Sequence, residues 1–156
     1  MRRSVVKGAL LGGAIGLALG VGGFTFLYAK GASYLTNDPR ACANCHIMQE
    51  HYDAWITSSH RSVATCNDCH APHDLLGKYI TKADNGFWHS FAFTTGDFHE
   101  PIRIKARNKR VTERACLDCH TQIADDLSAA HNTSHQRDQS LSCIRCHSDV
   151  GHPLRR

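Results

Sequence analysis

The sequence predicts a mainly α-helical fold with much irregular structure, in which one N-terminal transmembrane helix precedes a small exported domain. An uncharged run of 22 residues extends from Gly8 to Ala29. The rest of the chain has too few apolar residues for a conventional core over ~120 residues. It also shows no alternation of apolar and polar residues that would indicate a sheet. The 156 residues therefore suffice for one domain and an anchor, and exclude a large catalytic fold with a separate cofactor domain.

The uncharged run is long enough to cross a bilayer, because 22 helical residues span ~33 Å at about 1.5 Å each. A cleaved signal peptide is the alternative, but its apolar region is usually about 7–15 residues long and ends at an A-x-A-like site. Three basic residues precede the run and favour a cytoplasmic N-terminus: Arg2, Arg3 and Lys7. We therefore expect a signal anchor over residues 1–30 in the cytoplasmic (inner) membrane, with residues 31–156 on its periplasmic face.

The anchor carries a glycine every four residues, at Gly8, Gly12, Gly16 and Gly20. This small-xxx-small pattern lets helix backbones approach closely, so it predicts self-association or packing against a partner helix. Glycine is also common in membrane helices generally, which is the alternative explanation.

The net charge of +4 belongs to the first thirty residues, because residues 31–156 carry 14 Lys and Arg against 14 Asp and Glu. A neutral exported domain has no net positive field to attract phosphates. Nucleic acid is therefore excluded as a partner.

Every cysteine lies in one of four C-x-x-C-H motifs, which is the attachment signature of c-type haem. The two thiols form thioethers and the adjacent imidazole reaches the iron. Structural zinc gives no reason for histidine in all four copies, and a dithiol enzyme needs only one motif. The sequence therefore predicts four covalently bound haem c groups, which form the core of the domain. The motifs are Cys42, Cys45 and His46; Cys66, Cys69 and His70; Cys116, Cys119 and His120; and Cys143, Cys146 and His147.

Four irons offer eight axial positions, and the motif histidines fill at most half of them. Eight further histidines are available, of which we expect about half to be ligands. They are His51, His60, His73, His89, His99, His131, His135 and His152.

The first motif continues into Ile47-Met48, Ala71-Pro72-His73 follows the second, and His152 lies five residues beyond His147. With the anchor and the four motifs in this order, the chain resembles the NapC/NirT/NrfH family of membrane-anchored multihaem cytochromes c. It is most similar to the NrfH branch, the small subunits of cytochrome c nitrite reductase. The resemblance implies that Met48, and not His46, binds the first iron. The alternative is an ordinary apolar Met48 behind a His46-ligated haem.

The resemblance also implies ligands for the other irons. At the second haem His152 would face His70, and at the third His60 would face His120. His147 would bind the fourth iron, whose remaining position is closed in the NrfH branch by a lysine of the catalytic subunit.

A quinol site near the first haem is a further implication of the resemblance. Lys82 matches a family lysine near the quinol headgroup, although a solvated surface lysine is the plain alternative. Relatives place a carboxylate nearby, where this chain offers His89 or, one gap away, Asp84. Quinol oxidation releases two protons along with two electrons, so a titratable acceptor is needed there. Five aromatic residues in this segment suit a membrane interface, or alternatively pack around haem: Phe87, Trp88, Phe91, Phe93 and Phe98.

Helices are expected near 46–58, 74–95 and 120–131, with Asp74 capping the second and Asp38-Pro39 marking the exit from the anchor region. The motifs form two dihaem halves, about 42–70 and 116–152. Between them, Arg103 to Arg114 holds six basic residues against one acid. We expect this basic segment to be solvated and to neutralise haem propionates, or alternatively to dock a partner or anionic lipid.

The resemblance therefore implies a tetrahaem cytochrome that oxidises menaquinol and passes electrons to a pentahaem nitrite reductase catalytic subunit, which makes ammonia in anaerobic respiration. It would be an electron-transfer subunit with quinol dehydrogenase activity, not the nitrite-reducing subunit. One alternative is a quinol dehydrogenase that serves another periplasmic reductase or a cytochrome pool. Another is a haem enzyme that reduces a substrate itself, which the short chain disfavours.

Overall fold

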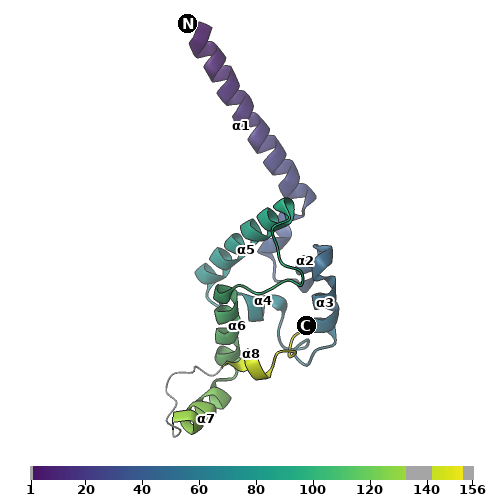
Figure 1. The fold of residues 1–156 in the computed structure, drawn as a ribbon, viewed down its shortest axis with the longest axis vertical. Coiled ribbons are helices and arrows are strands. Elements are labelled where there is room, and N and C mark those ends of the chain that lie inside the picture. Colours follow the sequence, from purple (N-terminus) through teal and green to yellow (C-terminus); the bar gives the residue numbers. More distant parts are fainter. Residues whose placement is uncertain (1, 133–141, 153–156) are drawn as a thin grey trace. The chain divides into compact units, whose positions relative to one another are not determined.

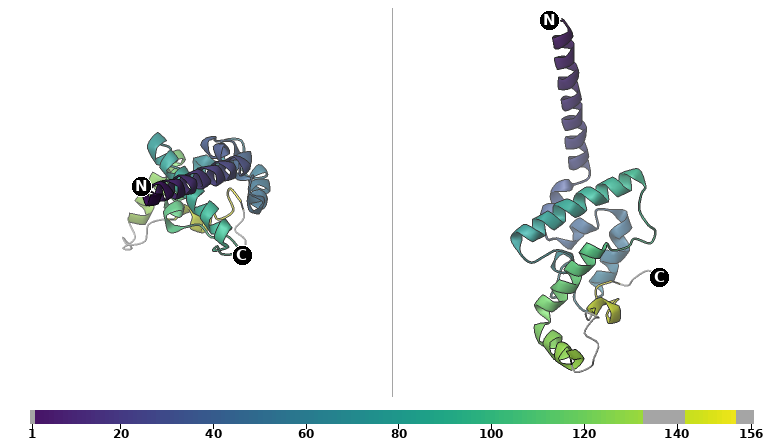
Figure 2. Two further views of the ribbon diagram at one scale, coloured as in Figure 1. Left: turned by 90° about the horizontal axis from the view of Figure 1, so that it is seen from above. Right: turned by 60° about the vertical axis from the view of Figure 1, so that its left-hand side comes forward.

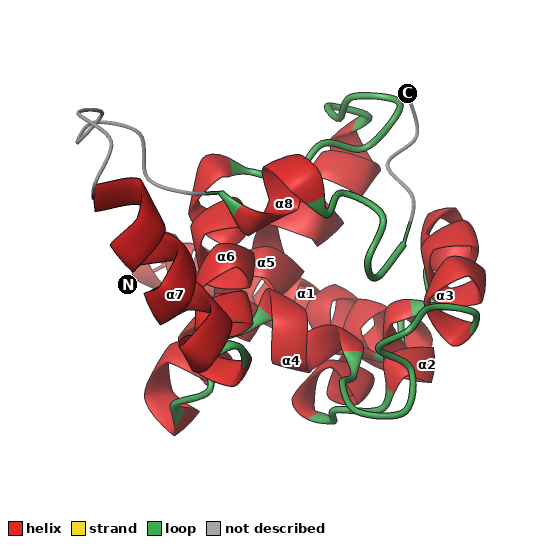
Figure 3. Cartoon of the chain, turned by 90° about the horizontal axis from the view of Figure 1, so that it is seen from below, coloured by secondary structure: helices red, strands yellow, loops and turns green. Residues whose placement is uncertain are grey.

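The computed structural model describes residues 2–132 and 142–152, without the side chains of 128–132 (Figure 1). All regular structure in these ranges is helical, and Figure 3 shows helices and loops only. The mainly helical fold is thus confirmed. The chain divides into two compact units, Met1–Thr36 and Asn37–Arg156.

The first unit contains α1 (Arg2–Tyr28) and the short 3-10 helix η1 (Gly31–Leu35). Helix α1 is long and apolar enough to cross a membrane, and its described side chains are all exposed. A Cβ on Gly31 would overlap the Phe26 ring, so only glycine allows η1 to pack this closely on α1. A Cβ on the four evenly spaced glycines of α1 would meet nothing within 4 Å. Self-association therefore stays a prediction.

The second unit begins with three short helical segments around the first motif: α2 (Pro39–Cys42), η2 (His46–Met48) and α3 (Gln49–Ile56). Asp38 caps α2, because its carboxylate accepts a hydrogen bond from the Arg40 N–H at 2.9 Å. The Trp55 indole donates to the Ala64 carbonyl at 3.0 Å and fastens the following loop to α3. The helix predicted near 46–58 is present as η2 and α3.

Helix α4 (Cys66–His70) is one turn long and carries the whole second motif. Its start is fixed by Asp68, whose carboxylate accepts from the Thr65 N–H at 2.8 Å and from the Thr65 hydroxyl at 2.7 Å. Burial raises the pKa of Asp68, but these hydrogen bonds and nearby Lys78 outweigh burial and hold that pKa below its ordinary value. An ionised Asp68 therefore stabilises a turn that would be marginal alone.

Helix α5 (Leu75–Thr95) confirms the helix predicted near 74–95. Asp74 caps it as predicted, since its carboxylate accepts from the Gly77 N–H at 2.6 Å. The helix ends at Gly96, whose φ of 74° is a left-handed conformation that glycine adopts without strain.

Three helices complete the second unit: α6 (Ala106–Cys119), α7 (Thr121–Asn132) and α8 (Cys143–Cys146). The helix predicted near 120–131 is α7. Helix α6 was not among the predicted helices, because its many arginines and lysines hide the short apolar stripe around Val111 and Ala115. Most of the basic segment therefore belongs to a helix, with the third motif at the C-terminal end of that helix.

Helix α4 packs against α6, and α6 packs against α8. The right-hand view of Figure 2 shows the yellow α8 next to the lower end of the green α6. Only four side chains are buried among the described residues: Ala71, Thr81, Lys82 and Ala115. The two alanines lie where α4 and α6 meet. The protein supplies so little apolar core that the domain agrees with one built around haem.

Replacing Asp74 by alanine should lower the free energy of unfolding by about 1 kcal/mol, because the first turn of α5 loses its cap. Urea unfolding of the haem-loaded protein in detergent, followed by circular dichroism, measures the change. Asp97→Ala, just beyond the other end of the same helix, is the control and should change stability by less than about 0.5 kcal/mol. Equal losses in the two variants would contradict the capping role of Asp74.

Candidate functional site

The four C-x-x-C-H motifs each occupy a helical turn or its edge, and their eight cysteines form no disulfide. Residues three apart on a helical turn lie on one side of it, so both thiols of a motif can reach one porphyrin edge. The second motif fills α4, the third ends α6, and the fourth lies on α8. The first spans the break between α2 and η2.

Neighbouring motifs adjoin in chain order, because the helices that carry them pack together: α2 against α4, α4 against α6, and α6 against α8. The surroundings of the thiols agree with this order. A hydrogen bond from the Cys66 thiol lowers the pKa of Cys42 to about 7, and the pKa of Cys66 is raised in turn. Burial and nearby Cys116 raise the pKa of Cys69. Burial and nearby Cys143 likewise raise the pKa of Cys116. The first motif thus lies beside the second, the second beside the third, and the third beside the fourth.

Two pairs of imidazoles face each other at the spacing of axial ligands. The ring centroids of His70 and His152 are 5.9 Å apart with planes 11° from parallel, and those of His60 and His120 are 6.2 Å apart at 73°. Metal–nitrogen bonds of about 2 Å on both faces of one ion place two imidazole centroids roughly 6 Å apart. His51 also approaches His152, but its centroid distance of 4.7 Å leaves too little space for a metal between them.

The protonation state of His70 and the tautomer of His60 also suit metal binding. Burial lowers the pKa of His70 to about 4, and the neighbouring His152 and His51 contribute to that shift. His70 is therefore neutral at physiological pH, which is the form that binds iron. His60 has the Ser59 hydroxyl 3.1 Å from its Nδ1, so its Nε2 is the nitrogen left to bind a metal.

The remaining ligand candidates differ in exposure. Met48 is half-buried whereas His46 is exposed, and His147 is exposed at the end of α8. No group of three or more His, Cys, Asp or Glu side chains converges within residues 2–132 and 142–152. The donors are instead imidazole pairs beside paired thiols, and this set fits c-type haem.

The structure gives no facing imidazole for His73 or His99 among the described residues. The His73 Nε2–H donates to the Asp68 carbonyl at 2.9 Å, and its Nδ1 is 3.7 Å from an Asp118 carboxylate oxygen, so His73 links α4 to α6. His99 is exposed. The His131 side chain and all of His135 lie outside the described residues.

Lys82 is buried, with 9% of its surface exposed, on the second turn of α5. Its ammonium group donates to the Asn37 side-chain oxygen at 3.3 Å and lies 5.8 Å from the Tyr79 ring centroid. Burial and Lys78 lower its pKa, while Cys42 of the first motif opposes them. Lys82 therefore lies close to the first motif, and it is not the solvated surface lysine of the alternative.

Asp84 and His89 lie on different sides of α5. His89 follows Lys82 by seven residues, which is almost two full turns, so the two lie on the same side of α5, ~10 Å apart along the helix axis. His89 is exposed as a whole residue. Partial burial of its ring lowers its pKa, nearby Lys105 lowers that pKa further, and Asp84 opposes the shift. Asp84 is turned toward α6, where its carboxylate pairs with Arg107. The structure thus brings Lys82 and His89 onto one side and Asp84 onto another.

The second half of α5 presents an exposed aromatic cluster of Phe87, Trp88 and Phe91. Their ring centroids are 5.2 to 6.3 Å apart. The Lys105 ammonium lies 5.2 Å from the Trp88 ring centroid, and the Phe93 and Phe98 rings are 4.5 Å apart. An aromatic surface next to a cation suits the interface of a bilayer rather than bulk water.

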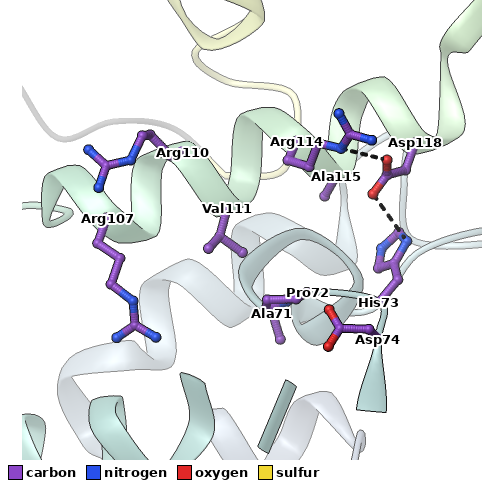
Figure 4. A pocket seen from close by; sticks show the side chains of 10 residues that line it. All are labelled: Ala71, Pro72, His73, Asp74, Arg107, Arg110, Val111, Arg114, Ala115 and Asp118. Atoms are coloured by element: carbon purple, nitrogen blue, oxygen red, sulfur yellow. Dashed lines mark ion pairs between the residues drawn. The ribbon is translucent and has the colours of Figure 1, made fainter. Parts of the chain in front are cut away.

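A pocket lies between α6 and the turn that follows α4 (Figure 4). Arg114 bonds Asp118 at 3.0 Å, and Asp118 in turn faces His73 across the pocket. The Arg110 side chain points away from it. Arg107 pairs with Asp84. Two of the three arginines that line the pocket, Arg107 and Arg114, thus have acidic partners. The lining residues are Ala71, Pro72, His73, Asp74, Arg107, Arg110, Val111, Arg114, Ala115 and Asp118.

Comparison with known proteins decides the family. Residues 3–156 match the sequence family described as "NapC/NirT cytochrome c family, N-terminal region". The chain belongs to this family. Its cofactor is accordingly c-type haem. The family resemblance inferred from the sequence motifs is thus confirmed. One relative is the cytochrome c-type protein NrfH of Wolinella succinogenes, 36% identical over 86% of this chain and 81% of that protein.

Two further matches have related descriptions. The cytochrome c nitrite reductase subunit NrfH of Nitratidesulfovibrio vulgaris is 32% identical over 80% of this chain and 72% of that protein. Among solved structures, the crystal structure of a cytochrome c nitrite reductase NrfHA complex bound to the HQNO inhibitor matches with a TM-score of 0.63. That match is 30% identical and covers 96% of this chain and 90% of that one.

Some site residues of this family member were not found by sequence reasoning. Asn37 and Arg107 contact Lys82 and Asp84 only through the tertiary fold, and no local pattern indicates either contact. The Asn108 side chain likewise donates to the Asn85 side chain at 2.9 Å, next to the Asp84–Arg107 pair.

The ion pair between Asp84 and Arg107 should stabilise the fold only slightly, because 39% and 43% of the two side chains are exposed. We expect a coupling free energy of about 0.5 kcal/mol from a double-mutant cycle of Asp84→Asn and Arg107→Gln, measured by urea unfolding. The coupling should shrink in high salt. A coupling above about 2 kcal/mol, insensitive to salt, would contradict an exposed pair.

Proposed function

We propose that this chain is a membrane-anchored tetrahaem cytochrome c that oxidises menaquinol and passes the electrons to a multihaem nitrite reductase catalytic subunit. The observation that carries the proposal is the row of four motifs, adjoining in chain order, with facing imidazole pairs at 5.9 and 6.2 Å. Similarity to NrfH proteins over most of the chain supports the acceptor.

The chain's own residues would hold four haems, one at each motif. When bound, the haems would carry electrons one at a time from the quinol to the partner protein. His70 with His152 would hold the second iron, and His60 with His120 the third. His147 would help to hold the fourth, and a lysine of the catalytic subunit would supply a further ligand. Met48 would hold the first, which agrees with its greater burial than His46.

Lys82 and His89 form the proposed quinol site, because they lie on one side of α5 and Lys82 is next to the first motif. The buried ammonium of Lys82 would donate a hydrogen bond to a quinol oxygen. Quinol oxidation releases two protons with its two electrons. A neutral His89 would accept these protons one at a time and, because it is exposed, pass each of them to water. Its lowered pKa favours the neutral form before oxidation. Asp84 is engaged by Arg107 and would act by positioning α5.

The apolar helix and the aromatic cluster support the proposed membrane arrangement. The basic residues before the apolar run favour a cytoplasmic N-terminus, so the haem domain would lie on the periplasmic face. The exposed ring cluster of Phe87, Trp88 and Phe91 would then meet the lipid from which a quinol approaches.

A second candidate keeps the quinol site and changes the acceptor to another periplasmic reductase. The family match favours keeping it in view, since its description is broader than nitrite reduction. Proteoliposomes that contain the full chain and a menaquinol analogue separate the two. Added pentahaem nitrite reductase should make haem oxidation nitrite-dependent. Haem reduction without any such transfer would favour the second candidate.

In the same proteoliposomes, Lys82→Met and His89→Ala should each slow haem reduction by the menaquinol analogue at least about tenfold, because each removes a hydrogen-bonding or proton-accepting group. Asp84→Asn should slow it less than about threefold. Stopped-flow absorbance measures the rates, and reduction by dithionite, which needs no quinol site, is the control. Unchanged quinol rates in both Lys82→Met and His89→Ala would exclude this site.

His152→Ala and His60→Ala should each convert one low-spin haem to high spin, because each empties one axial position. The two variants should affect different haems, and the double variant should affect two. Electron paramagnetic resonance of the purified protein measures the spin states. His51→Ala is the control and should leave all low-spin signals intact. A spin change in His51→Ala alone would reverse the assignment of His152.

Met48→Leu should change the optical and magnetic spectra of one haem, and His46→Ala should leave them as in the wild type. The reason is that thioether ligation ends when the sulfur is removed, whereas an unligated histidine contributes nothing to the iron spectrum. If His46→Ala changes the spectrum and Met48→Leu does not, His46 is the ligand.

A further inference from the structure

Thr112 of α6 lies next to the imidazole of the second motif. Its hydroxyl oxygen is 3.5 Å from His70 Nδ1, at the long end of the hydrogen-bond range. The two residues are 42 apart in the sequence and meet only because α4 packs against α6. Both are half-buried, so bulk water competes weakly for either group.

The hydrogen-bond roles can be assigned from the other partner of Thr112. Its hydroxyl donates its single proton to the Asn108 carbonyl at 3.2 Å, because a carbonyl can only accept. The oxygen then faces His70 with a lone pair, so His70 Nδ1 must carry the proton and donate it. That tautomer leaves Nε2 as the nitrogen with a free lone pair.

We propose that Thr112 is a positioning residue for His70, which orients the imidazole, fixes its tautomer and lowers the reduction potential of the iron that His70 binds. The inference rests on the proposed assignment of His70 as an axial ligand. A hydrogen bond donated by the far nitrogen of a ligand imidazole makes the ligand more basic, and a more basic ligand favours ferric iron.

Small side chains lie next to Thr112 and His70 where α4 meets α6. Ala115, three residues along α6, is buried with only 7% of its surface exposed, and Ala71 directly follows His70 with 2% exposed. These small side chains let the two helices approach. The Thr112 carbonyl also lies 3.3 Å from Cys116 Sγ, so one residue contacts both the second and the third motif.

The test is a redox titration of the haem-loaded full chain in detergent, monitored optically and by electron paramagnetic resonance. Thr112→Val removes the hydroxyl at nearly constant volume. It should raise the reduction equilibrium constant of one haem about threefold, which is an upward shift of about 30 mV at 59 mV per tenfold change. The affected haem should be the one whose spin state changes in His152→Ala. Thr112→Ser keeps the hydroxyl and should keep the wild-type potential.

Thr94→Val is the matched control, because the Thr94 hydroxyl makes the same bond to the carbonyl four residues earlier, that of Ser90, at 2.7 Å. It should leave every potential unchanged. If Thr112→Val yields no haem-loaded protein, Thr112→Ala takes its place in the comparison with Thr112→Ser. Unchanged potentials in the variant without a hydroxyl, or equal shifts with and without it, overturn the proposal. The titration needs neither quinol nor nitrite reductase, so its outcome is independent of the quinol and acceptor proposals.

Discussion

The contact between α4 and α6 is the constraint on which the arrangement of the second unit depends. It is possible because the side chains at the contact, Ala71 and Ala115, are among the smallest available. A larger residue at either position would force the two helices apart. The contact brings the second motif beside the third, although Cys69 and Cys116 are 47 positions apart in the sequence. It also places Thr112 against the imidazole of the second motif. Two small side chains therefore allow the second and third motifs to become neighbours.

Much of this arrangement could be predicted from the sequence, because its strongest signals are local. Motif spacing indicates covalent haem, the uncharged run indicates the anchor, and Asp74 is recognisable as a cap because a helical pattern follows it. The pairing of His152 with His70 came from the family resemblance, and the ring geometry agrees with it. Helix α6 escaped prediction because charged residues outnumber apolar ones along most of its length.

Contacts between distant segments could not be predicted in this way. Nothing near Asp84 in the sequence indicates that Arg107 will pair with it, because the pair exists only once α5 and α6 are folded. The sequence alone therefore could not indicate that Asp84 and His89 have different surroundings. The two sides of α5 differ in what they contact: one side bonds α6, and the other carries Lys82 and His89.

The lengths of the motif helices bear on how the protein matures. Helices α4 and α8 have five and four residues, far below the ~12 residues at which an isolated helix becomes even marginally stable in water. Helix α5 has 21 residues and a cap at each end. In a newly made chain, α5 can therefore form before the turns of the second and fourth motifs, which are too short to be stable alone. Covalent attachment of haem and formation of these turns are then one coupled event, so the order of attachment can shape the order of folding.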